Sequence, residues 1–234
     1  MSFYDSAFYS DQEDGSRVSA KIVLSQLFER VGTPTSAIDI GCGVGTWAAE
    51  LLEQGVSKVV GVDGDYVPRD RLYIPRDNFF ACDLNLELLK FDKKFDFCIC
   101  LEVAEHLNPE RADSFIAEIL NMSTSVLFSA AIPGQGGTHH INEQWQSYWV
   151  NKFNSQGFFA EFDIRSLVWE SENVEFWYKQ NMFFFSKKTL ENRIDIIDVV
   201  HPEMFKYRCE SYKKNICDLY RHRSRFARIF KFLR

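Results

Sequence analysis

The chain has 234 residues, 46% of them hydrophobic, and a net charge of −6 at pH 7. This length can bury a full core in one domain, and no run of about 18 apolar residues predicts a membrane span. The acidic, polar N-terminus is unlike a secretory signal. The six cysteines form no C-x-x-C pair, which is typical of a reducing compartment rather than of a disulfide framework or a zinc site. We therefore expect a cytoplasmic protein.

Strand-like and helix-like segments alternate along the chain. Residues 16–32 have helical periodicity and end in glycine. Short apolar runs then predict strands at 37–40, 58–63, 78–83, 95–101 and 125–131. Helical segments are predicted between them at 46–55 and 109–122. This alternation indicates βαβ units and a mostly parallel sheet.

The turn after the first predicted strand is rich in glycine. The sequence AIDIGCGVGTW (37–47) ends a strand in an acid and places three glycines at alternate positions. Glycine allows a positive φ and a close approach of the backbone to a ribose or phosphate. The second strand ends in Asp63, whose carboxylate can accept both hydroxyls of a ribose. An NAD-type or an adenosyl-type ligand would fit, but Thr46 stands where the dinucleotide fingerprint needs its last glycine.

Four segments in this order, DIGCGVGTW, VVGVD, ACDLN and FDFCICLEVAEHL, resemble the motifs of class I S-adenosylmethionine-dependent methyltransferases. The resemblance covers about residues 35–187. It implies S-adenosylmethionine as the cofactor. It also implies an α/β fold, a Rossmann-like three-layer sandwich whose seven-stranded, mostly parallel sheet has helices on both faces and one antiparallel strand near the end.

The resemblance further implies a set of cofactor-binding residues. These are Asp39, Gly41, Cys42, Gly43, Gly45, Asp63, Gly64, Asp83, Leu84, Leu101 and Glu102. The glycine turn would lie beside the amino-acid end of the cofactor, and Asp63 would hold the ribose hydroxyls. Asp83 would face the adenine amine, and Glu102 would lie near the methionine part. By itself, Asp83 is equally explained as an acid that begins a turn.

The implied reaction is an in-line attack on the methyl carbon of a sulfonium, for which the protein orients the reactants and removes a proton. The loop IPGQGGTHHINEQW (132–145) directly follows the fifth predicted strand. Imidazoles accept protons near neutral pH, so we expect His140 to be the catalytic base, with His139 as the second candidate. The alternative is that these histidines only cap or solvate the next helix.

A possible metal site would use His140 as a ligand instead of as a base. Glu102, Glu105 and His106 follow i, i+3, i+4 spacing, which on a helix gives one shared face. Together with His140 they could hold Mg²⁺ or a similar divalent cation, as in some O-methyltransferases that resemble this pattern. Other relatives carry E-V-x-E-H without a metal, so the sequence leaves the metal open.

Aromatic and polar residues are dense between 163 and 185. Most are explained as core, although Trp and Tyr also stack on sugars, and Arg and Asn bond hydroxyls. The candidate acceptor-binding residues are Arg165, Trp169, Tyr178 and Asn181. Residues 138–205 look similar to methyltransferases associated with bacterial surface-polysaccharide biosynthesis, which implies a sugar hydroxyl as the acceptor. The [ND]-P-P-[YF] element expected for methylation of base nitrogens does not follow the fourth predicted strand.

The C-terminal segment has its own charge. Residues 221–234 hold six Arg and Lys and no acid, so the preceding 220 residues carry −12. Such an acidic body would repel nucleic acid, which we do not expect as a partner. As a helix, the segment would gather Phe226, Ile229, Phe230 and Leu233 on one face. It could rest on anionic lipid at the inner face of a membrane, dock on a partner such as a glycosyltransferase or on the acidic body, or stay solvated.

These observations predict three parts: an N-terminal cap and helix (1–34), a methyltransferase core (35–190) and a C-terminal helical extension (191–234). The predicted function is S-adenosylmethionine-dependent O-methylation of a sugar or polysaccharide-derived hydroxyl. One alternative is O-methylation of another small molecule, such as a quinone-like hydroxyl, with a metal favouring this reading. Another is a cofactor-binding partner subunit without turnover. An NAD-dependent oxidoreductase is disfavoured, since Thr46 stands where the dinucleotide fingerprint needs its last glycine.

Overall fold

The computed structural model describes residues 6–161, 163–187 and 197–232, without the side chains of 6–14, 218 and 220–232. The chain divides into two compact units, residues 1–199 and 200–234, which are described separately. The N-terminal helix belongs to the first unit, where it packs on two further helices. The predicted boundary at 190 lies outside the described residues.

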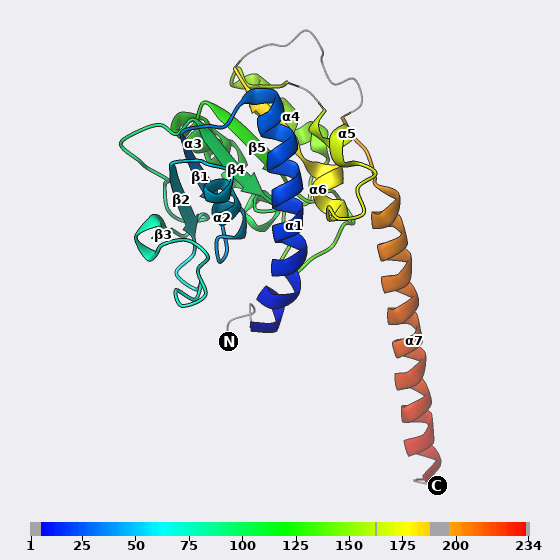
Figure 1. Ribbon diagram of the computed structural model, residues 1–234. Coiled ribbons are helices and arrows are strands. Elements are labelled where there is room, and N and C mark those ends of the chain that lie inside the picture. Colours follow the sequence, from blue (N-terminus) through cyan, green and yellow to red (C-terminus); the bar gives the residue numbers. More distant parts are fainter. Residues whose placement is uncertain (1–5, 162, 188–196, 233–234) are drawn as a thin grey trace. The chain divides into compact units, whose positions relative to one another are not determined.

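The first unit is built on one seven-stranded sheet (Figure 1). Its strands are β1 (Ser36–Ile40), β2 (Lys58–Asp63), β3 (Phe79–Ala81), β4 (Phe97–Leu101), β5 (Ser125–Ser129), β6 (Phe159–Ala160) and β7 (Phe183–Ser186). Their order is β3-β2-β1-β4-β5-β7-β6. Strands β1 to β5 run parallel, whereas β7 is antiparallel to both of its neighbours. The predicted fold class is confirmed.

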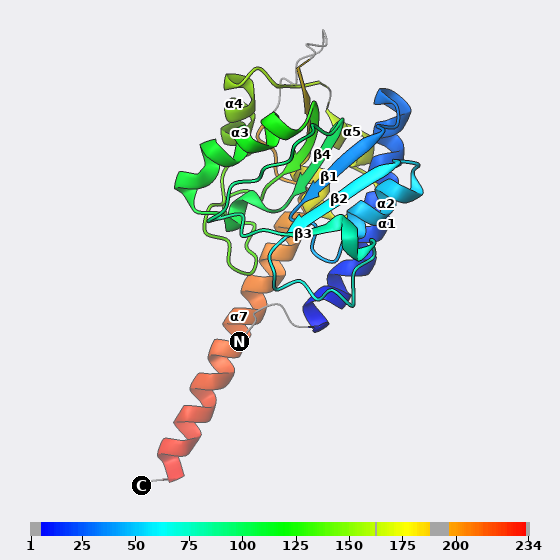
Figure 2. The ribbon, with the colours of Figure 1, turned by 90° about the vertical axis from the view of Figure 1, so that its left-hand side faces the viewer.

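Helices cover both faces of this sheet (Figures 1 and 2). One face carries α1 (Ser6–Val31), α2 (Thr46–Glu53), α5 (Ile164–Val168) and α6 (Phe176–Asn181). The other carries α3 (Ala112–Met122) and α4 (Gln146–Ser155). Three short 3₁₀ helices complete the described unit: η1 (Arg76–Asn78), η2 (Ala104–His106) and η3 (Pro109–Arg111).

Side-chain alternation along the strands divides the core into two layers. In β1, Ile38 and Ile40 pack with α3, whereas Ala37 packs with α2. Asp39 lies on the same face as Ala37 and is buried there. The strand that precedes the glycine turn therefore carries a buried acid toward the α2 side.

The predicted elements agree with the observed ones apart from their ends. Helix α1 begins at Ser6 rather than at residue 16, and residues 109–111 form η3 ahead of α3. The predicted third strand is shorter, at Phe79–Ala81. These differences leave the topology unchanged.

The strand order reverses between β1 and β4, which are neighbours although β2 and β3 separate them in the sequence. Ligands of open α/β sheets bind outside the carboxyl ends of the strands at such a reversal. The glycine turn follows β1, and Glu102 follows β4. The fold thus brings the two main sequence motifs to one edge of the sheet.

The second unit contains one long helix, α7 (Pro202–Phe232). Across the described part of the chain, no helix has both the length and the apolar character that crossing a bilayer requires. The backbone of the predicted basic end continues α7 through Phe232. The side chains of that end lie outside the described residues.

Candidate active site

The glycine turn between β1 and α2 uses its glycines in different ways. Gly41, Gly43 and Gly45 have φ angles of 75°, 54° and 87°, a region that L-residues with side chains rarely adopt. A Cβ at position 41 would lie 2.2 Å from Val103 Cγ2, so this glycine lets the turn pack against the segment after β4. A Cβ at position 43 would meet no atom within 4 Å. Gly43 therefore keeps the outer surface of the turn bare, as a close ligand requires.

Asp63, at the end of β2, is held by three donors. Its Oδ2 accepts a hydrogen bond from the Gly43 N–H at 2.7 Å. Its Oδ1 accepts from the Gly64 N–H and from the Tyr66 hydroxyl, both at 2.6 Å. Burial raises the pKa of Asp63, and these hydrogen bonds oppose the rise. The acid predicted to hold the ribose is thus tied directly to the glycine turn.

Tyr66 was not among the predicted site residues. Its side chain is 58% exposed, and its ring covers Gly64, where a Cβ would lie 2.1 Å from Tyr66 Cε1. The signal in the sequence was a phenol three residues after Asp63, with Gly64 between them leaving room for the ring.

Asp39 gives the site a second buried carboxyl group. Its Oδ2 is buried without a hydrogen-bond partner among the described residues. Burial and the nearby Asp63 carboxylate raise the pKa of Asp39 to about 8. A positive group placed here would stabilise the ionised carboxylate, whereas a pyrophosphate would be repelled. The electrostatics therefore favour a cationic ligand, such as one with an ammonium and a sulfonium, over NAD.

The remaining predicted cofactor residues are less distinctive. Asp83 is exposed, and its Oδ1 accepts a hydrogen bond from the Asn85 N–H at 3.0 Å, as in a turn-initiating acid. Leu84 and Cys42 are buried, and Leu101 packs partly buried against the core on the α2 side. Contact of Asp83 with an adenine stays a prediction.

Glu102 begins the second half of the site, and the predicted helical face through Glu102, Glu105 and His106 is wrong. Glu102 has a left-handed backbone (φ 55°), and only residues 104–106 form a 3₁₀ turn. The reason is local: the Glu102 N–H bonds back to the Ser129 carbonyl and hydroxyl at 3.1 Å, which turns the chain at the end of β4. Glu102, Glu105 and His106 therefore do not share one helical face, although the Glu102 carboxylate lies close enough to Glu105 to raise its pKa.

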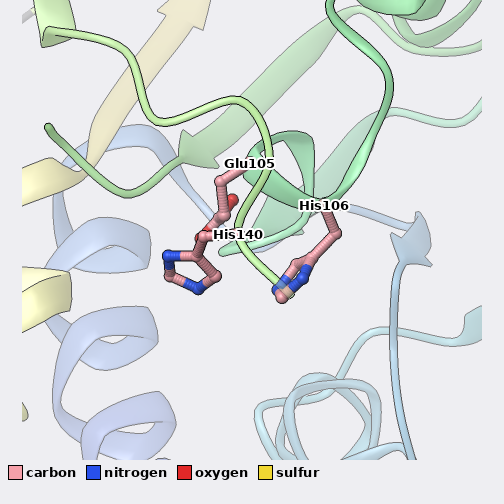
Figure 3. Close-up of side chains that lie close together, drawn as sticks. All are labelled: Glu105, His106 and His140. Atoms are coloured by element: carbon pink, nitrogen blue, oxygen red, sulfur yellow. The ribbon is translucent and has the colours of Figure 1, made fainter. Parts of the chain in front are cut away.

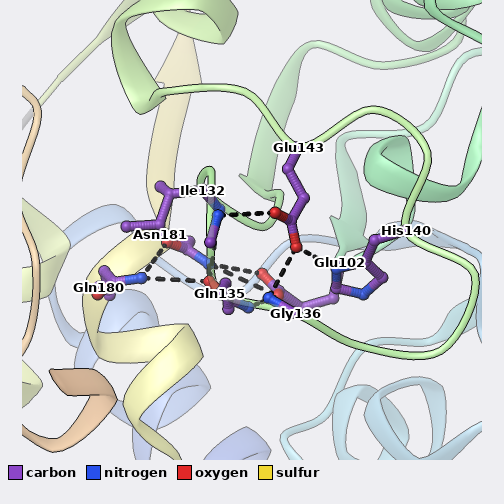
Figure 4. Close-up of polar contacts among 9 residues, drawn as sticks. Glu102, Ile132, Gln135, Gly136, His140, Glu143, Gln180 and Asn181 are labelled. Carbon is purple, nitrogen blue, oxygen red and sulfur yellow. Dashed lines mark hydrogen bonds and ion pairs between the residues drawn. The ribbon is translucent and has the colours of Figure 1, made fainter. Parts of the chain in front are cut away.

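The Glu102 carboxylate is held by two side-chain amides (Figure 4). Gln135 Nε2 donates to Oε2 at 2.9 Å, and Asn181 Nδ2 donates to Oε1 at 3.2 Å. The two amides also bond each other at 2.9 Å, and Gln180 Nε2 donates to Gln135 Oε1 at 3.2 Å. Burial raises the pKa of Glu102, and these donors oppose the rise. The structure thus brings Asn181, a predicted acceptor residue, to Glu102, together with Gln135, which the sequence did not single out.

Glu105, His106 and His140 converge beside this network (Figure 3). One ligand atom from each lies within 4.8 Å of the others. Both Glu105 carboxylate oxygens and His106 Nδ1 are buried without a hydrogen-bond partner in the described structure. Burial and the Glu102 carboxylate raise the pKa of Glu105, while burial and His140 lower the pKa of His106 to about 4. Burial disfavours the charged form of both groups, and a cation between them would offset that cost.

His140 is oriented by Glu143, which the sequence reading also missed (Figure 4). His140 Nδ1 lies 2.9 Å from Glu143 Oε1. Glu143 also accepts hydrogen bonds from the N–H groups of Gly136 at 2.7 Å and Gly134 at 2.8 Å. Although burial opposes ionisation, these bonds lower the pKa of Glu143. With Nδ1 occupied, Nε2 is the His140 nitrogen that can take a proton or a metal.

The loop backbone explains why the imidazole fits. A Cβ at Gly137 would lie 2.2 Å from His140 Nε2, so the glycine makes room for the ring. His139, the second predicted base, has a left-handed backbone with φ 59°. Gly137 thus makes room for the His140 ring, while the N–H groups of Gly134 and Gly136 hold Glu143 behind it.

Two of the predicted acceptor residues serve other parts of the fold. The Arg165 guanidinium is buried, bonds Asp163 at 2.7 Å and the Ile197 carbonyl at 2.7 Å, and stacks on Phe183. These contacts hold the guanidinium in the core beside β7, and its contact with an acceptor stays a prediction.

Tyr178 is buried as well, and it connects α6 with the start of α2. Its hydroxyl lies 3.1 Å from Ser16 Oγ and accepts a hydrogen bond from Trp47 Nε1 at 3.3 Å. Trp169 is partly buried after α5. For both residues, a role toward the acceptor stays a prediction.

Comparisons with known proteins identify the family of this chain. The methyltransferase domain family matches residues 13–193. A mitochondrial ubiquinone biosynthesis O-methyltransferase from Dictyostelium discoideum is 28% identical over 166 residues, which cover 62% of this chain. The chain spans about half of that relative, 49% of its length.

Solved structures share the fold. Magnesium protoporphyrin IX methyltransferase from Synechocystis, solved with bound S-adenosylmethionine, superposes with a TM-score of 0.54 at 19% identity, covering 76% of this chain and 83% of that one. An O-methyltransferase family protein from Burkholderia thailandensis gives a TM-score of 0.59 at 14% identity, covering 80% of this chain and 60% of that one. At such identities the likeness shows the fold alone. The family match over most of the chain shows more: the protein belongs to the methyltransferase domain family and is a class I S-adenosylmethionine-dependent methyltransferase.

Proposed function

We propose that the protein transfers a methyl group to a hydroxyl of a small molecule, and that a divalent cation held by Glu105, His106 and His140 assists the transfer. The observation that carries the proposal is the convergence of these three side chains, with both Glu105 oxygens buried and unpartnered among the described residues. Such orphaned polar atoms are costly in a protein interior. A cation ligand would remove that cost.

The three residues suit a small divalent cation. One carboxylate and two imidazoles are ligands accepted by Mg²⁺, Mn²⁺ or Zn²⁺. Opposite ligands of an octahedral ion lie about 4.2 Å apart, so the 4.8 Å spread here requires only small side-chain rotations. The Glu143 carboxylate behind His140 forms the usual carboxylate–histidine support of a metal ligand. The Glu102 carboxylate accepts hydrogen bonds from two side-chain amides instead, so it could bind the cation only after giving up one of these bonds.

The chain's own residues then divide the work. S-adenosylmethionine, when bound, supplies an electrophilic methyl group on a sulfonium. The glycine turn and Asp63 would hold the cofactor at the end of β1 and β2, and Asp39 would stabilise its positive amino-acid end. A cation at the Glu105 cluster would lower the pKa of an acceptor hydroxyl and orient it. Glu105 and the two imidazoles would hold their ligand atoms in place for that task.

A second reading keeps His140 as a direct base. The 2.9 Å contact of His140 Nδ1 with Glu143 favours it, because a carboxylate that orients an imidazole is typical of general-base pairs. In this reading Nε2 would take the acceptor proton, and Glu105 would play no chemical part. The two readings exclude each other, since one nitrogen cannot bind a metal and a proton together.

Titration with Mn²⁺ and Mg²⁺ separates them. Calorimetry on the wild type, Glu105→Gln and the exposed control Glu110→Gln should show one cation site that is lost only in Glu105→Gln. Loss of an outer partner of a metal ligand already costs about 10–100-fold in metal affinity, so loss of the ligand itself should cost at least as much. If no cation binds the wild type, or if Glu105→Gln binds it unchanged, the metal-assisted reading fails and the direct-base reading stands.

The acceptor class needs its own experiment. The matched relative in ubiquinone biosynthesis favours a phenolic hydroxyl, whereas the resemblance of residues 138–205 favours a sugar. A panel of catechols, quinols and sugar nucleotides, assayed by S-adenosylhomocysteine release with and without Mg²⁺, would decide. Turnover of sugar nucleotides alone would support a sugar hydroxyl as the acceptor. Turnover of catechols alone would support a phenolic hydroxyl instead.

A further inference from the structure

An exposed apolar stripe runs along the described side chains of α7, outside the residues that match the methyltransferase family. Four large side chains in it are more than half exposed: Phe205 (67%), Tyr212 (57%), Ile216 (52%) and Leu219 (67%). Their spacing of seven, four and three residues puts them on one side of a helix. Figure 2 shows α7 as one continuous helix. An amphipathic helix of this kind gains most of its stability from what covers its apolar side.

Charges are sorted around the apolar stripe. By helical geometry, Lys206 and Lys213 flank it on one side and Arg208 on the other. Two acidic residues with described side chains, Glu203 and Glu210, fall on the opposite side. Among the described side chains of α7, the border of the stripe is therefore basic.

The remaining residues of α7 add to its positive charge. Residues 221–232 add five Arg and Lys and no acid, so residues 202–232 hold nine basic and three acidic residues. The body of the chain, residues 1–201, carries −13. In the sequence, a basic amphipathic helix thus follows an acidic domain.

We propose that α7 binds the surface of an anionic lipid bilayer, with the apolar stripe at the boundary of headgroups and acyl chains. Lipid covers Phe, Ile and Leu while its phosphates meet Lys206, Arg208 and Lys213, so one surface satisfies both features. A second copy of α7 would instead bring these three basic residues against their own counterparts. Nucleic acid would pair the charges but would leave the apolar stripe in water.

The first test uses the full chain with vesicles of phosphatidylcholine, alone or mixed with phosphatidylglycerol. Cosedimentation should show binding to the mixed vesicles only, and added salt should weaken it. The double variant Lys206→Gln/Lys213→Gln should bind about thirtyfold more weakly, which corresponds to about 1 kcal/mol per charge. Lys214→Gln, on the far side of the helix, is the matched control and should lose far less.

The second test changes the apolar stripe. Ile216→Gln/Leu219→Gln should abolish vesicle binding, whereas Tyr207→Gln, an exposed aromatic on the opposite side, should keep it. Thermal unfolding and S-adenosylhomocysteine binding of each variant should match the wild type, which shows that the body is intact. Equal binding to neutral and anionic vesicles would overturn the proposal. So would a concentration-dependent dimer that Ile216→Gln/Leu219→Gln dissolves.

Discussion

Gly→Ala substitutions in and near the glycine turn can separate an effect on packing from an effect on ligand binding, because each adds a single methyl group at a known place. Gly43→Ala adds a methyl where no atom lies within 4 Å, so its only structural cost is a left-handed backbone. That cost is about 1–2 kcal/mol, and each kcal/mol lowers the Tm of a domain of this size by about 2–4 °C. The Gly43 N–H can still donate to Asp63. We therefore expect a folded protein with a modestly lowered Tm.

Cofactor binding should respond much more strongly. The added methyl stands on the surface that we assign to the cofactor, and displacing that contact should weaken S-adenosylhomocysteine by more than about tenfold, or 1.4 kcal/mol. Gly55→Ala is the matched control, because Gly55 also has a positive φ (92°) and no atom within 4 Å of a Cβ, but it lies at the end of α2. It should lose the same stability and keep the affinity.

Gly41→Ala completes the set. Its methyl would meet Val103 at 2.2 Å, so about 1–3 kcal/mol of overpacking adds to the backbone cost. Calorimetric titration and thermal unfolding of the three variants measure both quantities. If Gly43→Ala binds S-adenosylhomocysteine as the wild type does, the turn is not the binding surface and the reasoning fails.

Three further predictions concern buried charges and the histidine loop. Asp39→Asn should weaken S-adenosylhomocysteine binding, because it removes the carboxylate that would face the ammonium. Because the pKa of Asp39 is raised in the folded state, its contribution to stability is present below about pH 4 and is lost as the pH rises toward 8. Asp39→Asn should therefore become more stable relative to the wild type between pH 5 and about pH 8 in urea unfolding. Gly137→Ala should push the His140 ring aside and lower kcat about a hundredfold without changing S-adenosylhomocysteine affinity. Glu143→Gln should lower kcat by at least as much, since an amide no longer fixes the imidazole, and the kcat–pH profile should shift.

Each of these has a result that contradicts it. A constant stability difference between Asp39→Asn and the wild type across that pH range would mean that Asp39 is ionised in the fold. Full turnover in Gly137→Ala would show that the position of His140 does not matter. An unchanged pH profile in Glu143→Gln would reduce Glu143 to a support for the loop backbone.

The fold could be predicted largely from local patterns. Strands such as 37–40 and 58–63 are short apolar runs bounded by glycine and acids, and parallel pairing follows from the helices between them. The start of α1 could not be predicted, because residues 6–15 are polar and acidic and carry little apolar periodicity.

The candidate site could be predicted only where the topology of the parallel sheet places residues together. Asp39, Gly43 and Asp63 follow from two strand ends at one edge of the sheet. The backbone reversal at Glu102 could not, because it depends on Ser129 in the neighbouring strand. For the same reason Gln135 and Asn181, 46 residues apart, showed no sign in the sequence of sharing one carboxylate. The burial of Arg165 and its pairing with Asp163 also could not be predicted, because the sequence does not distinguish a buried, paired guanidinium from one that binds an acceptor.

Binding of the cofactor ribose to Asp63 stays a prediction, and the Tyr66 hydroxyl would make that binding an exchange of one hydrogen bond for another. Both oxygens of that carboxylate are already engaged, and a ribose that binds there would take over the place of the phenol on Oδ1. Exchanging one hydroxyl for another gains little net energy, so part of the affinity that the carboxylate could give is cancelled. When S-adenosylhomocysteine leaves, the Tyr66 hydroxyl would in turn replace the ribose hydroxyl as the donor to Asp63 Oδ1. A site built in this way favours rapid turnover over tight retention, and Tyr66→Phe would shift it toward retention, measurable as a slower dissociation of S-adenosylhomocysteine.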